Sequence, residues 1–142
     1  MITLEDVKKN SEVQSLINAA QEQVDALGYT EHSNRHINIV SSRCGEILQT
    51  LGYDEHIVEL GKIAGYLHDI GNAINRHDHA HSSAILAYQI LKEMGMSSDD
   101  RAQILMAIGN HDEETGSAVS HISAALILAD KSDVHRSRVT NT

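Results

Sequence analysis

Apolar residues recur three and four positions apart along most of the chain, a spacing that places them on one face of an α-helix. The first long stretch of this kind carries Val13, Leu16, Ile17, Ala20, Val24 and Leu27. Asn10 or Ser11 is placed to cap the beginning of this helix and Gly28 to end it, because these residue types satisfy the free backbone groups of helix termini. A short helix over residues 4–9 is predicted in front of it.

The same spacing predicts further helices over residues 35–51, 54–71, 79–94, 98–111 and 122–130, with polar loops over 72–78 and 112–120. Asp54 and either Ser97 or Ser98 are candidate caps for two of these helices. The chain has no proline and only 3% aromatic residues, which favours helices because strands are rich in β-branched and aromatic residues. We therefore predict an all-α fold, a compact helical bundle of about six helices in a single domain over residues 1–142.

The charge and cysteine content exclude several classes of protein. A net charge of -9 argues against binding a long nucleic acid, which requires a basic surface. No stretch approaches the about 18 apolar residues of a membrane span, and no basic start followed by an apolar run predicts a signal peptide. The single cysteine, Cys44, cannot form an internal disulfide, so we expect a cytoplasmic protein. The ten histidines, beside twenty carboxylates, supply many ligands for a metal ion.

Several of these residues stand where an apolar helical stretch ends. His68 and Asp69 close one predicted helix, His111 closes another, and Asp130 follows the apolar run of the last helix. His36 lies early in a long helix. His77, His79 and His81 alternate at the start of another helix, where only one or two of them can reach a common centre.

The order His36, Leu67-His68-Asp69-Ile70-Gly71, His79, His111 and Asp130 resembles the HD superfamily of metal-dependent phosphohydrolases, in particular its two-metal branch. The resemblance covers about residues 34 to 138 and implies an HD-domain core over 31–138, preceded by a helical extension over 1–30. It implies a metal site with the ligands His36, His68, Asp69, His79, His111 and Asp130. Within the histidine trio His79 is chosen because Ser83 and Ala84 follow it at the family's spacing, and His81 is the alternative.

The resemblance implies hydrolysis of a phosphoester or phosphoanhydride bond in a small nucleotide or related phosphate compound, by a metal-activated water. The ligand types suit one or two divalent transition metals (Fe, Mn, Co, Ni or Zn). Asp69, His68 and Lys131 are the expected catalytic residues. Asn72, Arg76 and Lys131 are the expected contacts to substrate, although Asn72 could equally bond Asp69. The loop 112–120 lacks the Gly-Tyr-Pro signature of the cyclic di-guanylate hydrolases, which argues against that substrate.

Two other functions stay open at this stage. One is a non-catalytic HD sensor that binds a metal and a nucleotide, and the other is a di-iron oxygenase. The sequence also leaves open whether the chain forms a homodimer. Asp133 is expected to be a surface carboxylate paired with Lys131 or Arg136, and His32, His56, His121 and His135 are expected to be ordinary histidines outside the site.

Overall fold

The structure, a computed structural model, describes residues 1–28, 34–112 and 117–133. Within these ranges it contains seven α-helices, one short 3-10 helix and no strand, which confirms the all-α prediction. In chain order the elements are α1 (Leu4–Lys9), α2 (Ser11–Ala26), α3 (Asn34–Thr50), α4 (Glu55–Leu67), η1 (Ile70–Ala73), α5 (His79–Glu93), α6 (Ser98–Gly109) and α7 (His121–Ser132). No helix in the described ranges is long and apolar enough to cross a membrane.

Side-chain caps set the beginning of most helices. Asn10 accepts a hydrogen bond from the backbone N–H of Val13, and Asp54 accepts one from Ile57. The sequence left the cap of α2 between Asn10 and Ser11 and that of α6 between Ser97 and Ser98. The structure places Asn10 and Ser97 in these positions.

The end of α4 differs from the sequence prediction. The helix stops at Leu67 rather than near residue 71, and the chain continues through η1. Gly71 packs against the start of α5, where its backbone N–H donates to Ser83 Oγ at 2.7 Å. A Cβ atom on Gly71 would lie 2.6 Å from Ser83 N, so this turn requires glycine. Periodicity alone cannot show such a contact, because Ser83 is remote in the sequence.

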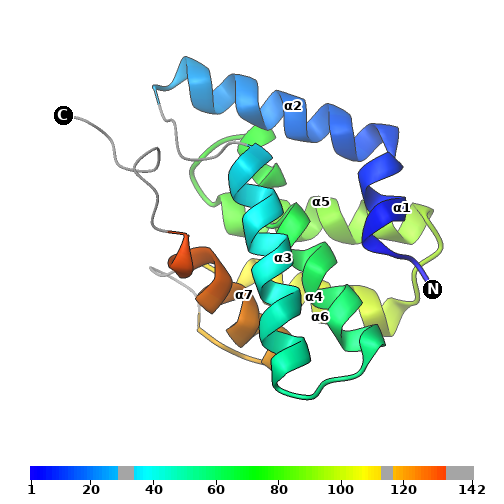
Figure 1. The fold of residues 1–142 in the computed structure, drawn as a ribbon. Coiled ribbons are helices and arrows are strands. Elements are labelled where there is room, and N and C mark those ends of the chain that lie inside the picture. The colour runs from blue at the N-terminus through cyan, green and yellow to red at the C-terminus, as the bar shows by residue number, and fades with distance from the viewer. Residues whose placement is uncertain (29–33, 113–116, 134–142) are drawn as a thin grey trace.

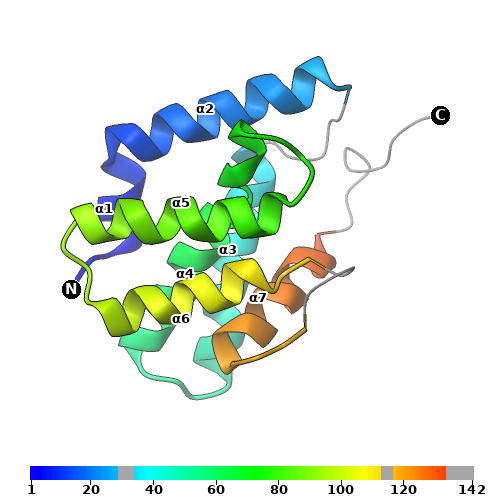
Figure 2. The same ribbon diagram turned by 180° about the vertical axis from the view of Figure 1, so that it is seen from behind.

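The helices α3 and α4 form the centre of the bundle (Figure 1). The helix α7 packs against both of them and against α6, and α5 and α6 lie side by side, as Figure 2 shows. The helix α2 lies across the end of the bundle where α3 begins, in contact with η1. The core is mainly aliphatic, yet it encloses two histidines, His36 and His68, that are fully buried.

The two central helices touch closely at Gly65. A Cβ atom there would lie 2.7 Å from Ser41 Cα and 3.0 Å from Val40 O, which are backbone atoms that cannot move away without shifting α3. The same contact leads directly to His68, three residues further along.

We expect Gly65→Ala to lower the free energy of unfolding by about 1–3 kcal/mol, because the added methyl group pushes α3 and α4 apart. Chemical denaturation of the two proteins measures this difference. Gly109→Ala is the control, since its Cβ would meet only Ala84 Cβ at an ordinary 3.6 Å. Equal stability of the Gly65→Ala variant and the wild type would contradict the close contact.

Candidate metal centre

Helix ends bring the predicted ligand residues together. His36 lies in the first turn of α3, His68 is the C-cap residue that follows the end of α4, and Asp130 lies in the last turn of α7. His79 begins α5, and His111 follows the end of α6. Asp69 stands between α4 and η1, in the middle of the group.

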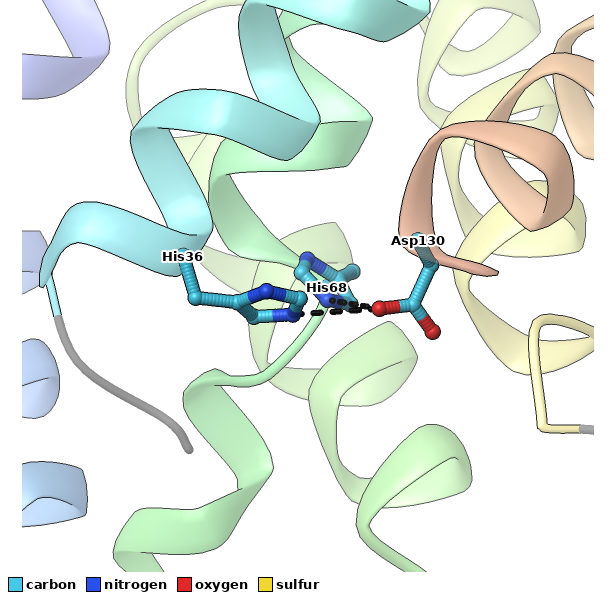
Figure 3. A group of neighbouring side chains, drawn as sticks. All are labelled: His36, His68 and Asp130. Carbon is cyan, nitrogen blue, oxygen red and sulfur yellow. Dashed lines mark ion pairs between the residues drawn. The ribbon is translucent and has the colours of Figure 1, made fainter. Parts of the chain in front are cut away.

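One half of the centre consists of His36, His68 and Asp130 (Figure 3). Asp130 Oδ1 lies 3.0 Å from His36 Nε2 and 3.5 Å from His68 Nε2. Asp69 Oδ2 approaches the same two nitrogens, at 3.7 Å from His36 and 3.3 Å from His68.

The other half of the centre consists of His79 and His111, which face the second carboxylate oxygen of Asp69. Asp69 Oδ1 is 3.3 Å from His79 Nε2 and 3.8 Å from His111 Nε2. The two oxygens of this carboxylate therefore face different pairs of histidines. A carboxylate in this position can bridge two neighbouring ions.

The second ring nitrogen of each histidine has an oxygen acceptor. The Nδ1 contacts are to Gly65 O for His68 (2.6 Å), to Ile108 O for His111 (2.5 Å), to Arg76 O for His79 (3.2 Å) and to Asp133 Oδ2 for His36 (2.7 Å). Carbonyl and carboxylate oxygens only accept hydrogen bonds, so Nδ1 carries the proton in every ring. In the neutral ring the lone pair is then on Nε2, the nitrogen that faces Asp69 and Asp130.

This donor set fits a transition metal. Ligand atoms of His36, His68 and Asp130 all lie within 4.8 Å of one another, and so do those of His68, Asp69 and His111. His68 Nε2 is buried and faces the carboxylates of Asp69 and Asp130. Imidazole and carboxylate together suit Mn, Fe, Co, Ni or Zn, and the hydrogen bonds at Nδ1 hold each ring in the orientation that a metal ligand needs.

The chain resembles known proteins over most of its length. No family model matches it. Ribonuclease Y of Lawsonia intracellularis is 35% identical over 105 residues, and that of Oleidesulfovibrio alaskensis is 33% identical over 105 residues. In both cases the match covers 74% of this chain but 18% of the relative, so the chain spans about a fifth of their length. An uncharacterized protein of Methanocaldococcus jannaschii is 29% identical over 137 residues, covering 81% of this chain and 52% of that protein.

A solved structure matches the fold itself. The crystal structure of a predicted HD superfamily hydrolase from an uncultured Thermotogales bacterium superposes with a TM-score of 0.65 and 25% sequence identity, over 92% of this chain and 73% of the other. The chain belongs to the HD superfamily. Its similar proteins thus include a predicted hydrolase of this superfamily and two proteins named Ribonuclease Y.

The burial of Asp133 shows that one sequence prediction was wrong. It was expected at the surface with Lys131 or Arg136, but only 3% of it is exposed. Its Oδ2 lies 2.7 Å from His36 Nδ1, and its two oxygens accept hydrogen bonds from the guanidinium group of Arg35, each at 3.1 Å. Its position three residues after Asp130 was the available signal, since residues three apart share a helix face. The partners on α3, almost a hundred positions away, could not be predicted from the sequence.

The structure also separates the three alternating histidines. His79 turns toward the centre, with its ring centroid 5.3 Å from that of His111. His81 is exposed on α5, and so is His77 before the helix. This arrangement favours His79 over His81 as the ligand in the proposed site.

The residues predicted to contact substrate lie at different depths. Asn72 is buried, and its side-chain N–H donates to the main-chain oxygen of Asp69 rather than to the carboxylate. Lys131 is exposed on α7 beside Asp130, and Arg76 is half-buried in the loop before α5. Of the histidines expected to be ordinary, His56 pairs with Asp100 away from the centre, while His32 and His135 lie outside the described residues, as does Arg136.

In the metal-free centre, the carboxylates of Asp69 and Asp130 keep the ring of His68 protonated. Burial lowers the pKa of His68, but Asp69 and Asp130 outweigh burial and raise this pKa to about 9. Burial and the neighbouring positive charge of His68 lower the pKa of His111 to about 4. At neutral pH, His68 is therefore charged and His111 neutral. Although burial raises the pKa of Asp130, hydrogen bonds from His36 and His68 lower it well below its ordinary value.

We expect metal binding to release about one proton between about pH 6 and about pH 8, because an ion at His68 Nε2 displaces the proton held there. The pKa of His68 is raised, so the affinity should increase as the pH rises and level off near the folded pKa of about 9. Calorimetric titration with Mn²⁺ or Ni²⁺ in two buffers of different protonation enthalpy counts the protons. Binding without proton release would contradict the charged state of His68.

We expect Asp133→Asn to weaken metal binding by about 10- to 100-fold, because a carboxylate bonded to the far nitrogen of a ligand orients its ring and raises its basicity. Metal affinity by competition with a chelator measures the effect. Arg35→Met is the matched control, since it removes the ion pair with Asp133 and leaves the hydrogen bond to His36. If both variants lose the same affinity, Asp133 acts through the packing of α3 and α7 and not through His36.

Proposed function

We propose that this HD domain is a metal-dependent phosphohydrolase that acts on a small nucleotide or a related phosphate compound. The observation that supports it best is the position of Asp69, whose two oxygens face His36 and His68 on one side and His79 and His111 on the other. A divalent ion bound there supplies a water of lowered pKa and positive charge beside the phosphoryl oxygens.

The residues of the chain define where the substrate approaches. His36 and His68 are fully buried, whereas the side chains of Asp130 and His79 are 21% and 12% exposed. The open side of the centre is therefore between Asp130 and His79. Lys131 is exposed beside Asp130 and provides a cation for a phosphate that arrives from this side.

The reaction balances as a hydrolysis. The oxygen of a water bonds to phosphorus, the bond from phosphorus to the leaving oxygen breaks, and the leaving oxygen takes one proton from the water. In this step Asp69 and Asp130 hold negative charge at the centre and keep their orientation through His36 and His68. No oxidant is consumed, which distinguishes the proposal from an oxygenase.

A second candidate is hydrolysis of phosphodiester bonds in RNA. It is favoured by the 35% identity with the Ribonuclease Y of Lawsonia intracellularis, a protein named as a ribonuclease. The net charge of -9 favours a small substrate, because a long RNA is bound mainly through cationic contacts to its phosphates.

The test is a hydrolysis screen with protein that has been stripped of metal and reloaded with Mn, Fe, Co, Ni or Zn. The substrates are nucleoside mono-, di- and triphosphates, dinucleotides and an RNA oligomer. We expect turnover of at least one small phosphate compound. Turnover of the RNA alone would favour the second candidate. Binding of metal and nucleotide without turnover would contradict the phosphohydrolase and favour a sensor.

We expect Asp69→Asn to lower the turnover of the best substrate by more than about 100-fold. Loss of a residue that only hydrogen-bonds a metal ligand costs about 10- to 100-fold, and loss of a ligand itself should cost more. The released phosphate or nucleoside measures turnover, and the bound metal is counted in the same samples. Asp78→Asn is the control, because Asp78 is exposed and its left-handed backbone also suits asparagine. Unchanged turnover in Asp69→Asn would exclude the proposed centre.

A further inference from the structure

A cavity lies at the end of the bundle that is remote from the metal centre. Tyr53, in the turn between α3 and α4, lines it together with residues from the beginnings of α4, α6 and α7. Figure 1 shows this turn at the end of the bundle away from α2. None of the described lining residues is among the proposed metal ligands.

Three helices set the distance between the cavity and the metal centre. Each carries a lining residue eight positions before a residue of the centre: Leu60 precedes His68, Gln103 precedes His111 and Ile122 precedes Asp130. Eight residues of α-helix span about 12 Å. A small molecule in the cavity therefore does not contact the metal ligands, and the cavity is a separate candidate site.

The cavity is large enough for a small molecule. Its solvent-accessible volume is about 400 Å³, and ligand pockets in proteins have volumes of about 300 to 1,000 Å³. The pocket beside Asp69, between α2 and η1, has a solvent-accessible volume of about 20 Å³, which is room for about one water. Of these two, the remote cavity is therefore the better place for an organic ligand.

The charge of the lining favours a cation. Asp99 and Asp100 stand in the first turn of α6 and line the cavity, whereas its described lining includes no lysine or arginine. Asp100 already pairs with His56 at 2.9 Å. Asp99 is exposed and forms no ion pair with a residue of the described ranges. The two carboxylates repel an anionic ligand, while a positively charged group gains a partner in Asp99.

Apolar and aromatic side chains make up another part of the lining. Ile57, Leu60 and Ile122 contribute aliphatic surface, and the rings of Tyr53 and His121 lie with their centroids 5.0 Å apart. The face of a tyrosine ring attracts a cation, and the aliphatic groups favour a ligand that has hydrocarbon of its own. A metal ion would not use such a lining. Within the described residues, both groups that could hold a metal belong to the centre.

We propose that this cavity binds a small organic cation, an alkyl amine whose ammonium group lies at Asp99 and whose hydrocarbon part lies against Ile57 and Ile122. The carboxylate supplies the attraction for the charge, and the aliphatic and aromatic groups distinguish the amine from an inorganic cation. The inference goes beyond the proposed hydrolysis and does not rest on it, because the two sites share no described residue.

The experiment titrates the protein with putrescine and follows side-chain methyl signals by NMR. The pH is 8, where an alkyl amine is charged and a histidine of ordinary pKa is neutral, and Zn²⁺ is present to compete for the carboxylates of the centre. We expect saturable shifts of Ile57 and Ile122, while Ile70, in the pocket beside Asp69, stays unchanged. 1,4-Butanediol has a chain of the same length without charge and should bind at least about fivefold more weakly.

A matched pair of variants tests whether Asp99 supplies the attraction. Asp99→Asn should weaken putrescine binding by about fivefold, because two unit charges about 4 Å apart in water attract each other by about 1 kcal/mol. Asp25→Asn is the control, since Asp25 is exposed on α2, does not line the cavity and changes the net charge by the same amount. The affinity of the control should equal that of the wild type.

Three results would overturn the proposal. Without a saturable shift of Ile57 and Ile122, the cavity does not bind the amine. If Asp99→Asn and Asp25→Asn bind putrescine equally well, the amine is attracted by the net charge of -9 and not by the cavity. If 1,4-butanediol binds as well as putrescine, the cavity recognises hydrocarbon and not a cation.

A second pair of variants keeps the test decisive should Asp99→Asn fail to fold. Gln103→Lys places a positive charge in the cavity and should weaken putrescine binding. Gln89→Lys adds the same charge at an exposed position of α5 outside the cavity and should leave the affinity unchanged. Equal affinities of these two variants would contradict the proposal.

Discussion

The centre depends on a hydrogen bond at the far side of each histidine. In three of the rings Nδ1 bonds a main-chain carbonyl three residues earlier, as His68 does with Gly65, His79 with Arg76 and His111 with Ile108. These carbonyls belong to the end of the preceding helix or to the turn before the next, where backbone oxygens lack partners within the helix. Each of these hydrogen bonds thus gives a main-chain carbonyl a donor and at the same time directs the ring Nε2 toward Asp69.

His36 is the exception, and the difference explains the role of Asp133. His36 lies in the first turn of α3 rather than after a helix end, and the acceptor at its Nδ1 is a side-chain carboxylate. The carboxylate of Asp133 takes that place and is held by Arg35. A second contact, from Arg43 to the main-chain oxygen of Ser132 at 2.8 Å, fastens the end of α7 to α3. The same contacts therefore orient His36 and bring Asp130 to it.

Whether a feature could be predicted from the sequence depends on how far apart its interacting residues lie along the chain. Helices, caps and the positions of His68, His111 and Asp130 at helix ends are local properties, and the periodicity indicated them correctly. The turn at η1 depends on the contact of Gly71 with Ser83, and the burial of Asp133 depends on Arg35, so both involve partners on other helices. The choice of His79 over His81 rests on its spacing to Ser83 and Ala84, and it stays a prediction; in the structure Ser83 Oγ accepts a hydrogen bond from the backbone N–H of Gly71.

The distribution of charge in this domain fits a centre that is completed by cations. Six histidine and carboxylate side chains lie close together in this centre, and at neutral pH His68 is charged while His111 stays neutral. A divalent ion held by His68, Asp69 and Asp130 would supply more positive charge to these side chains than that proton does.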